Sequence, residues 1–196
     1  KPSKFLSLII LGIIVVVISN LSEEESGDEV ISVTAKSKML LRGNSGEPGT
    51  LDPHKSSKGV EFIIAGDMFT GLLTGDKQGR IIPGCAAAYS VSDDGLIWTF
   101  TLRDGLKWSD GIGITSADFL YSFRRVLKPE TASPTGSLLF PIKNARAVNT
   151  GKLPAEMLGV SAPDEKTIVI ELEQITPYFE SLLPTYKSEL ENSYEE

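Results

Sequence analysis

Residues 99–124, TFTLRDGLKWSDGIGITSADFLYSFR, constrain the fold more than any other part of this sequence. The overlapping run 96–102 alternates apolar and polar side chains, which places Trp98, Phe100 and Leu102 on one face. This alternation is typical of a half-buried strand. The Asp-Gly pair at the end of the run 103–105 then predicts a turn, and a loop bearing Trp108 follows it.

A helix is predicted to begin directly after this loop. Thr115 and Asp118 have the S/T-x-x-D spacing of a capping box, in which each residue satisfies an unpaired group at the start of a helix. Phe119, Phe123 and Val126 recur at helical spacing and would share the buried face. The helix should end before Pro129, because the residue preceding a proline disfavours helical geometry.

The rest of the chain predicts a mixed α+β fold without internal repeats. Residues 60–72 suit an amphipathic helix whose buried face would carry Phe62, Ile63, Met68, Phe69 and Leu72. Further strands are expected at 38–42, 86–90 and 167–172, and further helices at 144–151 and 176–183. Turn signals stand at 75–79, 93–95 and 163–166.

The N-terminus has the pattern of an export signal. Lys1 and Lys4 precede an apolar run over residues 5–18, which is short for a membrane-spanning helix. No clean small-x-small cleavage site follows, so residues 1–21 are either a signal peptide or an uncleaved anchor. Residues 22–37 are polar and acidic and are expected to form a linker. On either interpretation the remaining chain is extracytoplasmic.

Charge and residue usage exclude several classes of function. The net charge is −7 and Lys and Arg form no cluster, which argues against binding to nucleic acid. Cys85 is the single cysteine and His54 the single histidine, so no internal disulfide and no His-based metal site are expected. Nothing beside either residue resembles a nucleophile motif. We therefore expect no catalytic residue, no metal ligand and no cofactor, and the chain is not expected to be an enzyme.

A series of short motifs resembles one known family. They are LDPHK at 51–55, MFTGLL at 68–73, KWSDG at 107–111, DFLYS at 118–122, TASP at 131–134, LGV at 158–160 and PYF at 177–179. Their order and spacing hold over residues 40–185. The chain is similar to the extracytoplasmic substrate-binding proteins of oligopeptide ABC importers, known as solute-binding protein family 5.

The resemblance implies an α+β protein with a periplasmic-binding-protein fold that is type II-like and belongs to cluster C. Residues 38–69 would start an incomplete first lobe, and residues 70–186 would form the small extra α+β domain of the peptide-binding class. Family members are more than twice as long, so the chain is expected to be a truncated N-terminal portion. Residues 187–196 then look like a tail foreign to the domain.

The resemblance also implies a function. Family members bind an extended oligopeptide between two lobes, largely through main-chain hydrogen bonds as in strand addition, and deliver it to the membrane subunits of an ABC importer. For this portion alone we expect weak peptide binding or none, because the opposing lobe holds the group that pairs with the ligand's α-ammonium. The alternative is a secreted or anchored remnant that binds no peptide and acts at most as an interaction module.

The resemblance implies few ligand-binding residues in this chain. Tyr121 matches a tyrosine that lines the ligand cleft, and the alternative is an aromatic at the edge of the core. Ser57, Lys58 and Gly59 match a loop whose backbone contacts the ligand, and the alternative is a plain connector. The family often has an acidic residue near Ser57, and here none is present. His54, Trp98 and Trp108 are expected to be structural.

Overall fold

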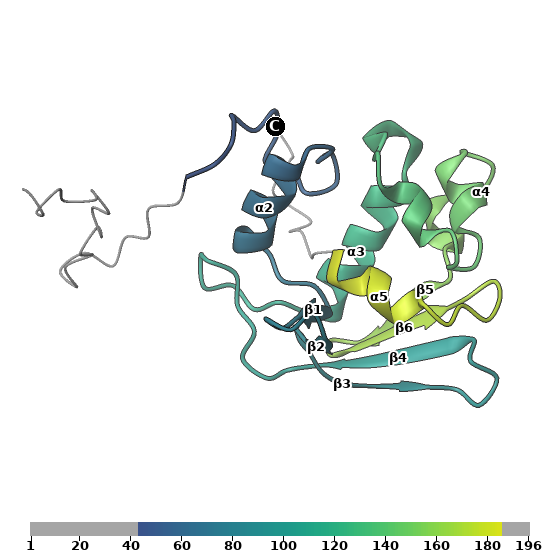
Figure 1. Ribbon diagram of the computed structural model, residues 1–196. Coiled ribbons are helices and arrows are strands. Elements are labelled where there is room, and N and C mark those ends of the chain that lie inside the picture. Colours follow the sequence, from purple (N-terminus) through teal and green to yellow (C-terminus); the bar gives the residue numbers. More distant parts are fainter. Residues whose placement is uncertain (1–42, 186–196) are drawn as a thin grey trace, which may run out of the picture. The chain divides into compact units, whose positions relative to one another are not determined.

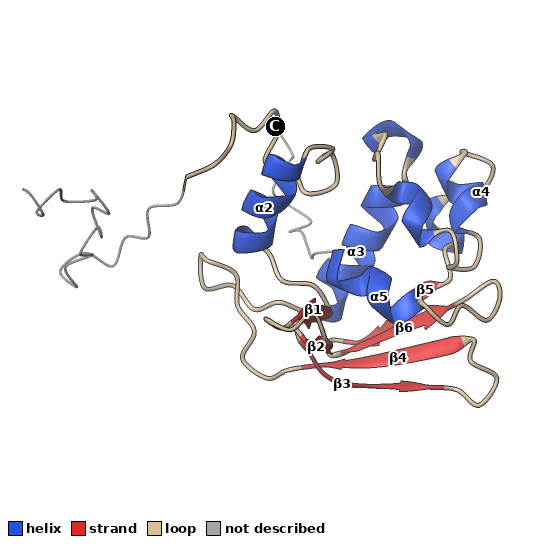
Figure 2. Ribbon diagram, in the orientation of Figure 1, coloured by secondary structure: helices blue, strands red, loops and turns tan. Residues whose placement is uncertain are grey.

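The computed structural model describes residues 43–185 of the 196-residue chain, and these residues have the predicted α+β fold. Its centre is an antiparallel four-stranded sheet, and the helices lie on one face of it (Figure 1). In sheet order the strands are β3 (Ala86–Val91), β4 (Ile97–Leu102), β6 (Thr167–Glu171) and β5 (Val160–Asp164). Figure 2 shows the separate pair formed by β1 (Leu73–Gly75) and β2 (Ile81–Pro83).

The hairpin of β3 and β4 forms where the sequence predicts it. The Ser92 N–H donates to the Ile97 carbonyl at 2.9 Å, and Gly95 between them has a φ of 72°, which a residue without Cβ adopts easily. The inward side chains of β4, Trp98, Phe100 and Leu102, are only 8%, 0% and 3% exposed. The predicted buried face of this strand is therefore confirmed.

Helix α3 (Ser116–Leu127) begins at the predicted capping box. The Asp118 carboxylate accepts the Thr115 N–H at 2.7 Å and the Thr115 hydroxyl at 3.1 Å. Phe119, Phe123 and Val126 are buried as expected, and the helix packs against β5 and β6. It ends before Pro129, as the sequence predicts.

Shorter helices complete the layer above the sheet. Helix α4 (Ala145–Asn149) is followed by Gly151 at a φ of 69°, close to the predicted stop. Helix α5 (Phe179–Leu182) begins later than predicted, because a turn in which the Phe179 N–H donates to the Thr176 carbonyl precedes it. The 3-10 segments are η1 (Pro129–Thr131), η2 (Gly136–Leu139), η3 (Ala155–Met157) and η4 (Leu183–Thr185).

Three strands have no clear signal in the sequence. The strands β1 and β2 have three residues each, which is too short to show alternation. Strand β5 contains Pro163, and its pairing with β6 shifts between Ser161 and Asp164. A proline is tolerated there because it lies on an edge strand at an irregularity in the ladder. The predicted turn at 163–166 is therefore shorter, and its first two residues belong to β5.

The first described helix, α2 (Gly59–Met68), differs from the prediction. Its buried side chains are those of Glu61 and Ala65, whereas Phe62, Ile63 and Met68 are 39%, 44% and 55% exposed. The expected apolar buried face is thus wrong, because the Glu61 carboxylate turns inward to accept backbone N–H groups. The helix also ends before the predicted residue 72.

Several predictions lie outside the described residues. These are the signal peptide or anchor at 1–21, the linker at 22–37, the strand at 38–42 and the tail at 187–196. The division into a first lobe at 38–69 and an extra domain at 70–186 stays a prediction. Within residues 43–185, no helix has the length and apolar character needed to cross a membrane.

Candidate functional site

The loop that precedes α2 is fastened to α3 by an ion pair. The Arg125 guanidinium donates to both carboxylate oxygens of Asp52, at 3.0 and 2.7 Å, and the two side chains are only 12% and 11% exposed. Burial alone would raise the pKa of Asp52, but hydrogen bonds from Arg125 and from the His54 N–H outweigh it and lower that pKa. Two-point pairing of this kind fixes geometry as well as charge.

His54 strengthens the same attachment. It is 3% exposed, its Nδ1 lies 2.9 Å from Arg125 Nη1, and its Nε2 lies 3.3 Å from Ser122 Oγ. Arginine only donates, so Nδ1 accepts, and a neutral imidazole then carries its proton on Nε2. The Nε2–H points at Ser122, so His54 does not act as a base toward that hydroxyl. His54 is structural, as expected.

The predicted ligand-contact loop is organised by Glu61. Its carboxylate accepts the N–H groups of Gly49 at 3.0 Å, Ser57 at 2.7 Å and Lys58 at 2.9 Å. The bonds from Ser57 and Lys58 are the main reason why the pKa of Glu61 is lowered. This loop is therefore a capped helix start with a fixed backbone, held by an acidic side chain that the sequence places three residues after Lys58.

Two of the backbone N–H groups expected to meet a ligand are thus already used. Ser57, Lys58 and Gly59 are all exposed. Among the described residues, nothing accepts the Gly59 N–H and nothing donates to the Ser57 carbonyl. A Cβ built at Gly59 meets nothing within 4 Å, so the space beside it is open. The Gly59 N–H and the Ser57 carbonyl are thus the backbone groups of this loop that make no backbone hydrogen bond within residues 43–185.

Tyr121 lies on α3, between the buried residues Phe119 and Phe123, and is itself partly exposed. Its hydroxyl makes no hydrogen bond to any residue in the described range. Tyr121 precedes Arg125 by one helical turn, so both lie on the side of α3 that faces the 52–54 loop. The structure thus holds the 52–54 loop against the side of α3 that carries Tyr121, and within residues 43–185 no hydrogen bond joins Tyr121 to Ser57, Lys58 or Gly59.

Sequence reasoning missed the residues that assemble this region. Asp52 and Arg125 are 73 positions apart, so no local pattern announces their pairing. Glu61 lies in the first turn of α2, where an acidic side chain often caps the helix. Its position three residues after Lys58 is a sequence signal that could have predicted this capping role. Trp98 is buried against Phe179 with ring centroids 5.4 Å apart, which agrees with its expected structural role.

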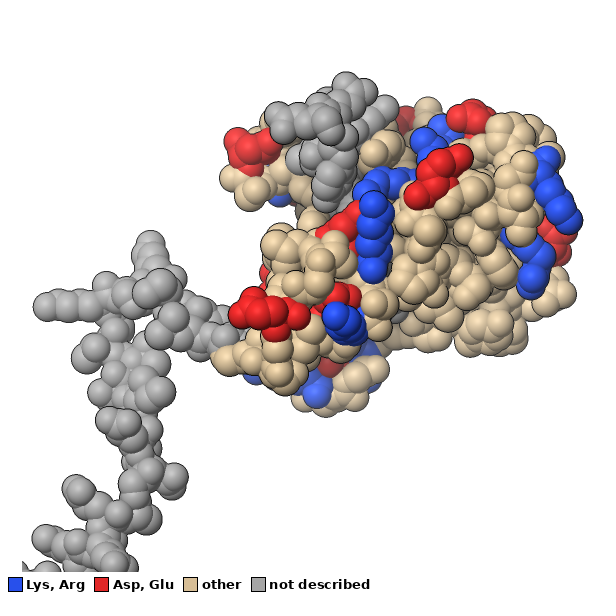
Figure 3. Space-filling model, turned by 90° about the horizontal axis from the view of Figure 1, so that it is seen from above, with Lys and Arg blue, Asp and Glu red and all other residues tan. Residues whose placement is uncertain are grey.

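The surface charge is mixed on the face drawn in Figure 3. Lys and Arg side chains alternate there with Asp and Glu, and most of the surface is neutral. A nucleic-acid interface needs a basic stripe, and this face of the described residues does not have one.

Comparison with known proteins decides the family. Residues 80–196 match the family model described as "Bacterial extracellular solute-binding proteins, family 5 Middle". The chain belongs to this family. The resemblance seen in the sequence is confirmed, and the family consists of solute-binding receptors rather than enzymes.

Curated relatives agree with this assignment. The chain is 38% identical over 172 residues to the periplasmic murein peptide-binding protein MppA of Escherichia coli strain K12, covering 84% of this chain and 32% of that protein. It is 40% identical over 180 residues to the periplasmic oligopeptide-binding protein OppA of Salmonella typhimurium, covering 90% and 33%. The chain thus spans about a third of the length of these relatives.

Solved structures give the same fold. The unliganded open form of MppA matches with a TM-score of 0.69 at 39% identity, covering 73% of this chain and 28% of that one. Haemophilus influenzae OppA in complex with RPPGFSPFR matches with a TM-score of 0.67 at 37% identity, covering 70% and 28%. The predicted fold class is confirmed for the part of the binding-protein fold that this chain covers.

Proposed function

We propose that this chain is the N-terminal part of an extracytoplasmic receptor that binds oligopeptides for an ABC importer. The observation that carries the proposal is the attachment of the 52–54 loop to α3 through Asp52, His54 and Arg125. On this proposal, the partly exposed Tyr121 and the open backbone at Gly59 would face the same bound peptide. Relatives named as oligopeptide-binding and murein peptide-binding proteins support the same conclusion.

The chemistry of this region suits main-chain recognition. A bound peptide must exchange its hydrogen bonds to water for bonds to protein groups. The Gly59 N–H and the Ser57 carbonyl offer one donor and one acceptor close together in the chain, and the Tyr121 hydroxyl adds a group with both roles. Recognition through main-chain groups predicts loose selectivity for the side chains of the bound peptide.

A hybrid receptor tests the proposal. Residues 44–185 would replace the matching segment of Salmonella typhimurium OppA, whose remaining two thirds would supply the rest of the cleft. Calorimetry with a defined tripeptide should show saturable binding by the hybrid. A folded hybrid, verified by cooperative unfolding, that binds no peptide would contradict a receptor role for this chain.

Partners and location follow as parts of the same proposal. We infer that the whole receptor works outside the cytoplasm with importer membrane subunits, and that residues 1–21 direct export as a signal peptide or an uncleaved anchor. The double substitution Ile14→Asp and Val16→Asp should keep the protein in the cytoplasm, because charges in the apolar core of a signal oppose its insertion into the membrane. Unchanged export in a fractionation assay would contradict the inference.

A second candidate is an interaction module that binds no peptide. Phe62, Ile63 and Met68 on α2 are apolar and exposed, and exposed apolar side chains can contribute to a contact with a partner. In this case the hybrid receptor would fold without binding peptide. Phe62→Ser would abolish association of the chain with its protein partner.

A further inference from the structure

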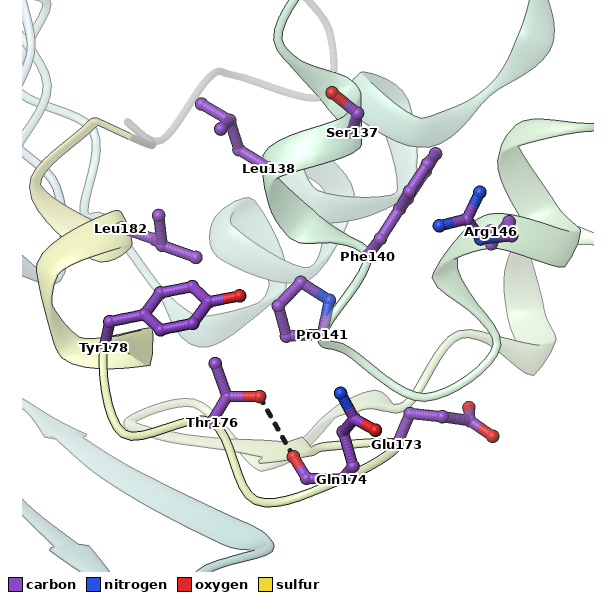
Figure 4. A pocket seen from close by; sticks show the side chains of 10 residues that line it. All are labelled: Ser137, Leu138, Phe140, Pro141, Arg146, Glu173, Gln174, Thr176, Tyr178 and Leu182. Carbon is purple, nitrogen blue, oxygen red and sulfur yellow. Dashed lines mark hydrogen bonds between the residues drawn. The ribbon is translucent and has the colours of Figure 1, made fainter.

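A hollow of about 450 Å³ opens between the region of η2 and α4 and the segment that leads into α5. It shares no lining residue with the candidate peptide site. Figure 4 shows its side chains, which divide into a charged end and an apolar end. We call this feature the Arg146 hollow.

The charged end presents two opposite charges that do not pair with each other. The Arg146 guanidinium lies over the Phe140 ring, with Cζ 4.5 Å from the ring centroid. Within residues 43–185, no carboxylate lies within ion-pair distance of it. Stacking on a ring holds a guanidinium in place and leaves the N–H groups at its edge available to an acceptor. Arg146 is thus a positioned cation with unused donors.

Glu173 lies on the same side of the hollow as Arg146 (Figure 4). One carboxylate oxygen accepts the Asn144 N–H at 3.1 Å, which fixes the side chain. A carboxylate has about four acceptor positions, so most of its capacity remains. Lys143, a cation on the same loop as Asn144, is already paired with Glu171 at 2.7 Å. The charged end therefore offers a cation with no ion pair to residues 43–185 and a carboxylate, near Lys143, that keeps unused acceptor positions.

The apolar end is formed by solvent-exposed side chains. Tyr178 is 61% exposed and Leu138 is 42% exposed. In Figure 4, Leu138, Tyr178 and Leu182 lie opposite the charged end, with Pro141 between the two ends and the Tyr178 hydroxyl directed toward it. An apolar group placed here would remove this surface from water.

We propose that the Arg146 hollow binds a free α-amino acid with an apolar side chain. The α-carboxylate and α-ammonium of such a zwitterion are bonded to one carbon, which matches a cation and an anion on one side of a hollow. The carboxylate would accept from Arg146, the ammonium would donate to Glu173, and the side chain would cover Pro141. A longer peptide separates its two terminal charges and does not satisfy this pair. This site goes beyond the proposed peptide-receptor function and does not depend on it.

The test uses the full 196-residue chain and measures binding of L-phenylalanine by calorimetry. Phenylalaninamide lacks the carboxylate, N-acetylphenylalanine lacks the ammonium and glycine lacks the apolar side chain. Each should bind at least about tenfold more weakly than phenylalanine, because each removes one charge-assisted or apolar contact.

Variants locate the site. Arg146→Gln and Glu173→Gln should each weaken phenylalanine binding about tenfold or more without lowering the melting temperature, since both side chains are exposed. Lys152→Gln, which removes an exposed cation outside the hollow, is the matched control and should leave affinity unchanged. Tyr121→Ala should likewise leave the affinity for phenylalanine unchanged, because Tyr121 does not line the Arg146 hollow.

Three results would overturn the proposal. These are no saturable binding at millimolar phenylalanine, equal affinity for phenylalanine and its amide, and affinity lost in Tyr121→Ala but kept in Arg146→Gln. The last result would place the ligand at the candidate peptide site, so it would reject the Arg146 hollow while supporting the receptor function.

Discussion

The hydroxyl of Tyr89 on β3 donates a hydrogen bond of 2.5 Å to the Glu180 carboxylate on α5. This contact joins edge strand β3 of the sheet to α5 across 91 positions of sequence. The bond to Glu180, then burial, raises the pKa of Tyr89 to about 12. Tyr89 also stacks on Trp98 and Phe100, with ring centroids 5.7 and 5.5 Å away.

The Tyr89–Glu180 bond predicts a loss of stability at alkaline pH. The unfolded chain releases this proton near pH 10, whereas the folded chain keeps it to about pH 12. The bond therefore stabilises fully below pH 10, and its contribution falls as the pH rises toward 12. The free energy of unfolding should differ between wild type and Tyr89→Phe below pH 10, and this difference should shrink near pH 12. A difference that does not change with pH would contradict the assignment, and Tyr178→Phe serves as the control.

The Asp52–Arg125 pair predicts a large cost for removing one partner. Asp52→Asn breaks the two-point ion pair between two largely buried side chains, Asp52 and Arg125, and breaking such a pair typically costs about 3–5 kcal/mol. Urea unfolding should show this loss. Asp76→Asn is the matched control, because Asp76 also pairs with an arginine, Arg80, whose side chain is 75% exposed; its loss should be small.

The Asp52 carboxylate also predicts that the free energy of unfolding depends on pH in the acid range. The pKa of Asp52 is lowered in the folded state, so its contribution is present above the ordinary value of 3.8 and is lost as the pH falls through the folded-state pKa. The stability difference between wild type and Asp52→Asn should therefore narrow on acidification below pH 3.8. An unchanged difference would show that the ion pair is not the source of the effect.

Local patterns predicted much of this fold because they act within a few residues. The alternation in 96–102 and the capping box from Thr115 to Asp118 each determine a structure by themselves, and β4 and α3 follow them. The short β1 and β2 pair depends on tertiary packing, with Leu72 and Leu73 almost fully buried, and no local period reveals that.

The candidate site was harder to predict for the same reason. Tyr121 and the 57–59 loop came from resemblance to a family, not from periodicity. The contacts that hold the preceding loop against α3 join Asp52 and His54 to Arg125, which lies 73 and 71 positions further along the chain. The α2 prediction is wrong because the spacing of its apolar residues does not determine which face is buried, and the inward face holds Glu61 and Ala65.

Close backbone packing predicts that Gly84 does not tolerate a side chain. A Cβ at this position would lie 2.4 Å from the Gly71 carbonyl oxygen, and neither backbone segment is free to move, because the Gly84 N–H donates to the Leu72 carbonyl at 2.9 Å. Gly84→Ala should destabilise by about 1–3 kcal/mol in urea unfolding. Gly75→Ala, which meets nothing within 4 Å, is the control. Equal stability of the two variants would argue against the close approach.

A functional role for Tyr121 predicts a loss of affinity with little loss of stability. In the hybrid receptor, Tyr121→Ala should weaken peptide binding by about 1–2 kcal/mol, the scale of a lost hydrogen bond and ring contact. Phe119→Ala is the structural comparison, since Phe119 is 2% exposed and its removal should cost about 3–5 kcal/mol of stability. If Tyr121→Ala leaves the peptide affinity unchanged and lowers the stability as much as Phe119→Ala does, Tyr121 is a structural residue at the edge of the core.

The last prediction concerns the chain without the rest of a receptor. The N–H groups of Ser57 and Lys58 are already bonded to Glu61, and the remaining groups at Ser57 and Gly59 are exposed, so water competes with any peptide for them. A ligand at about 100 times its dissociation constant would stabilise the fold by about 2.7 kcal/mol, which means a melting shift of several degrees for a domain of this size. We expect no resolvable shift with a millimolar pool of tri- to pentapeptides that contains no free amino acids. A reproducible shift of several degrees that Tyr121→Ala abolishes would show instead that this part of the receptor binds peptides by itself.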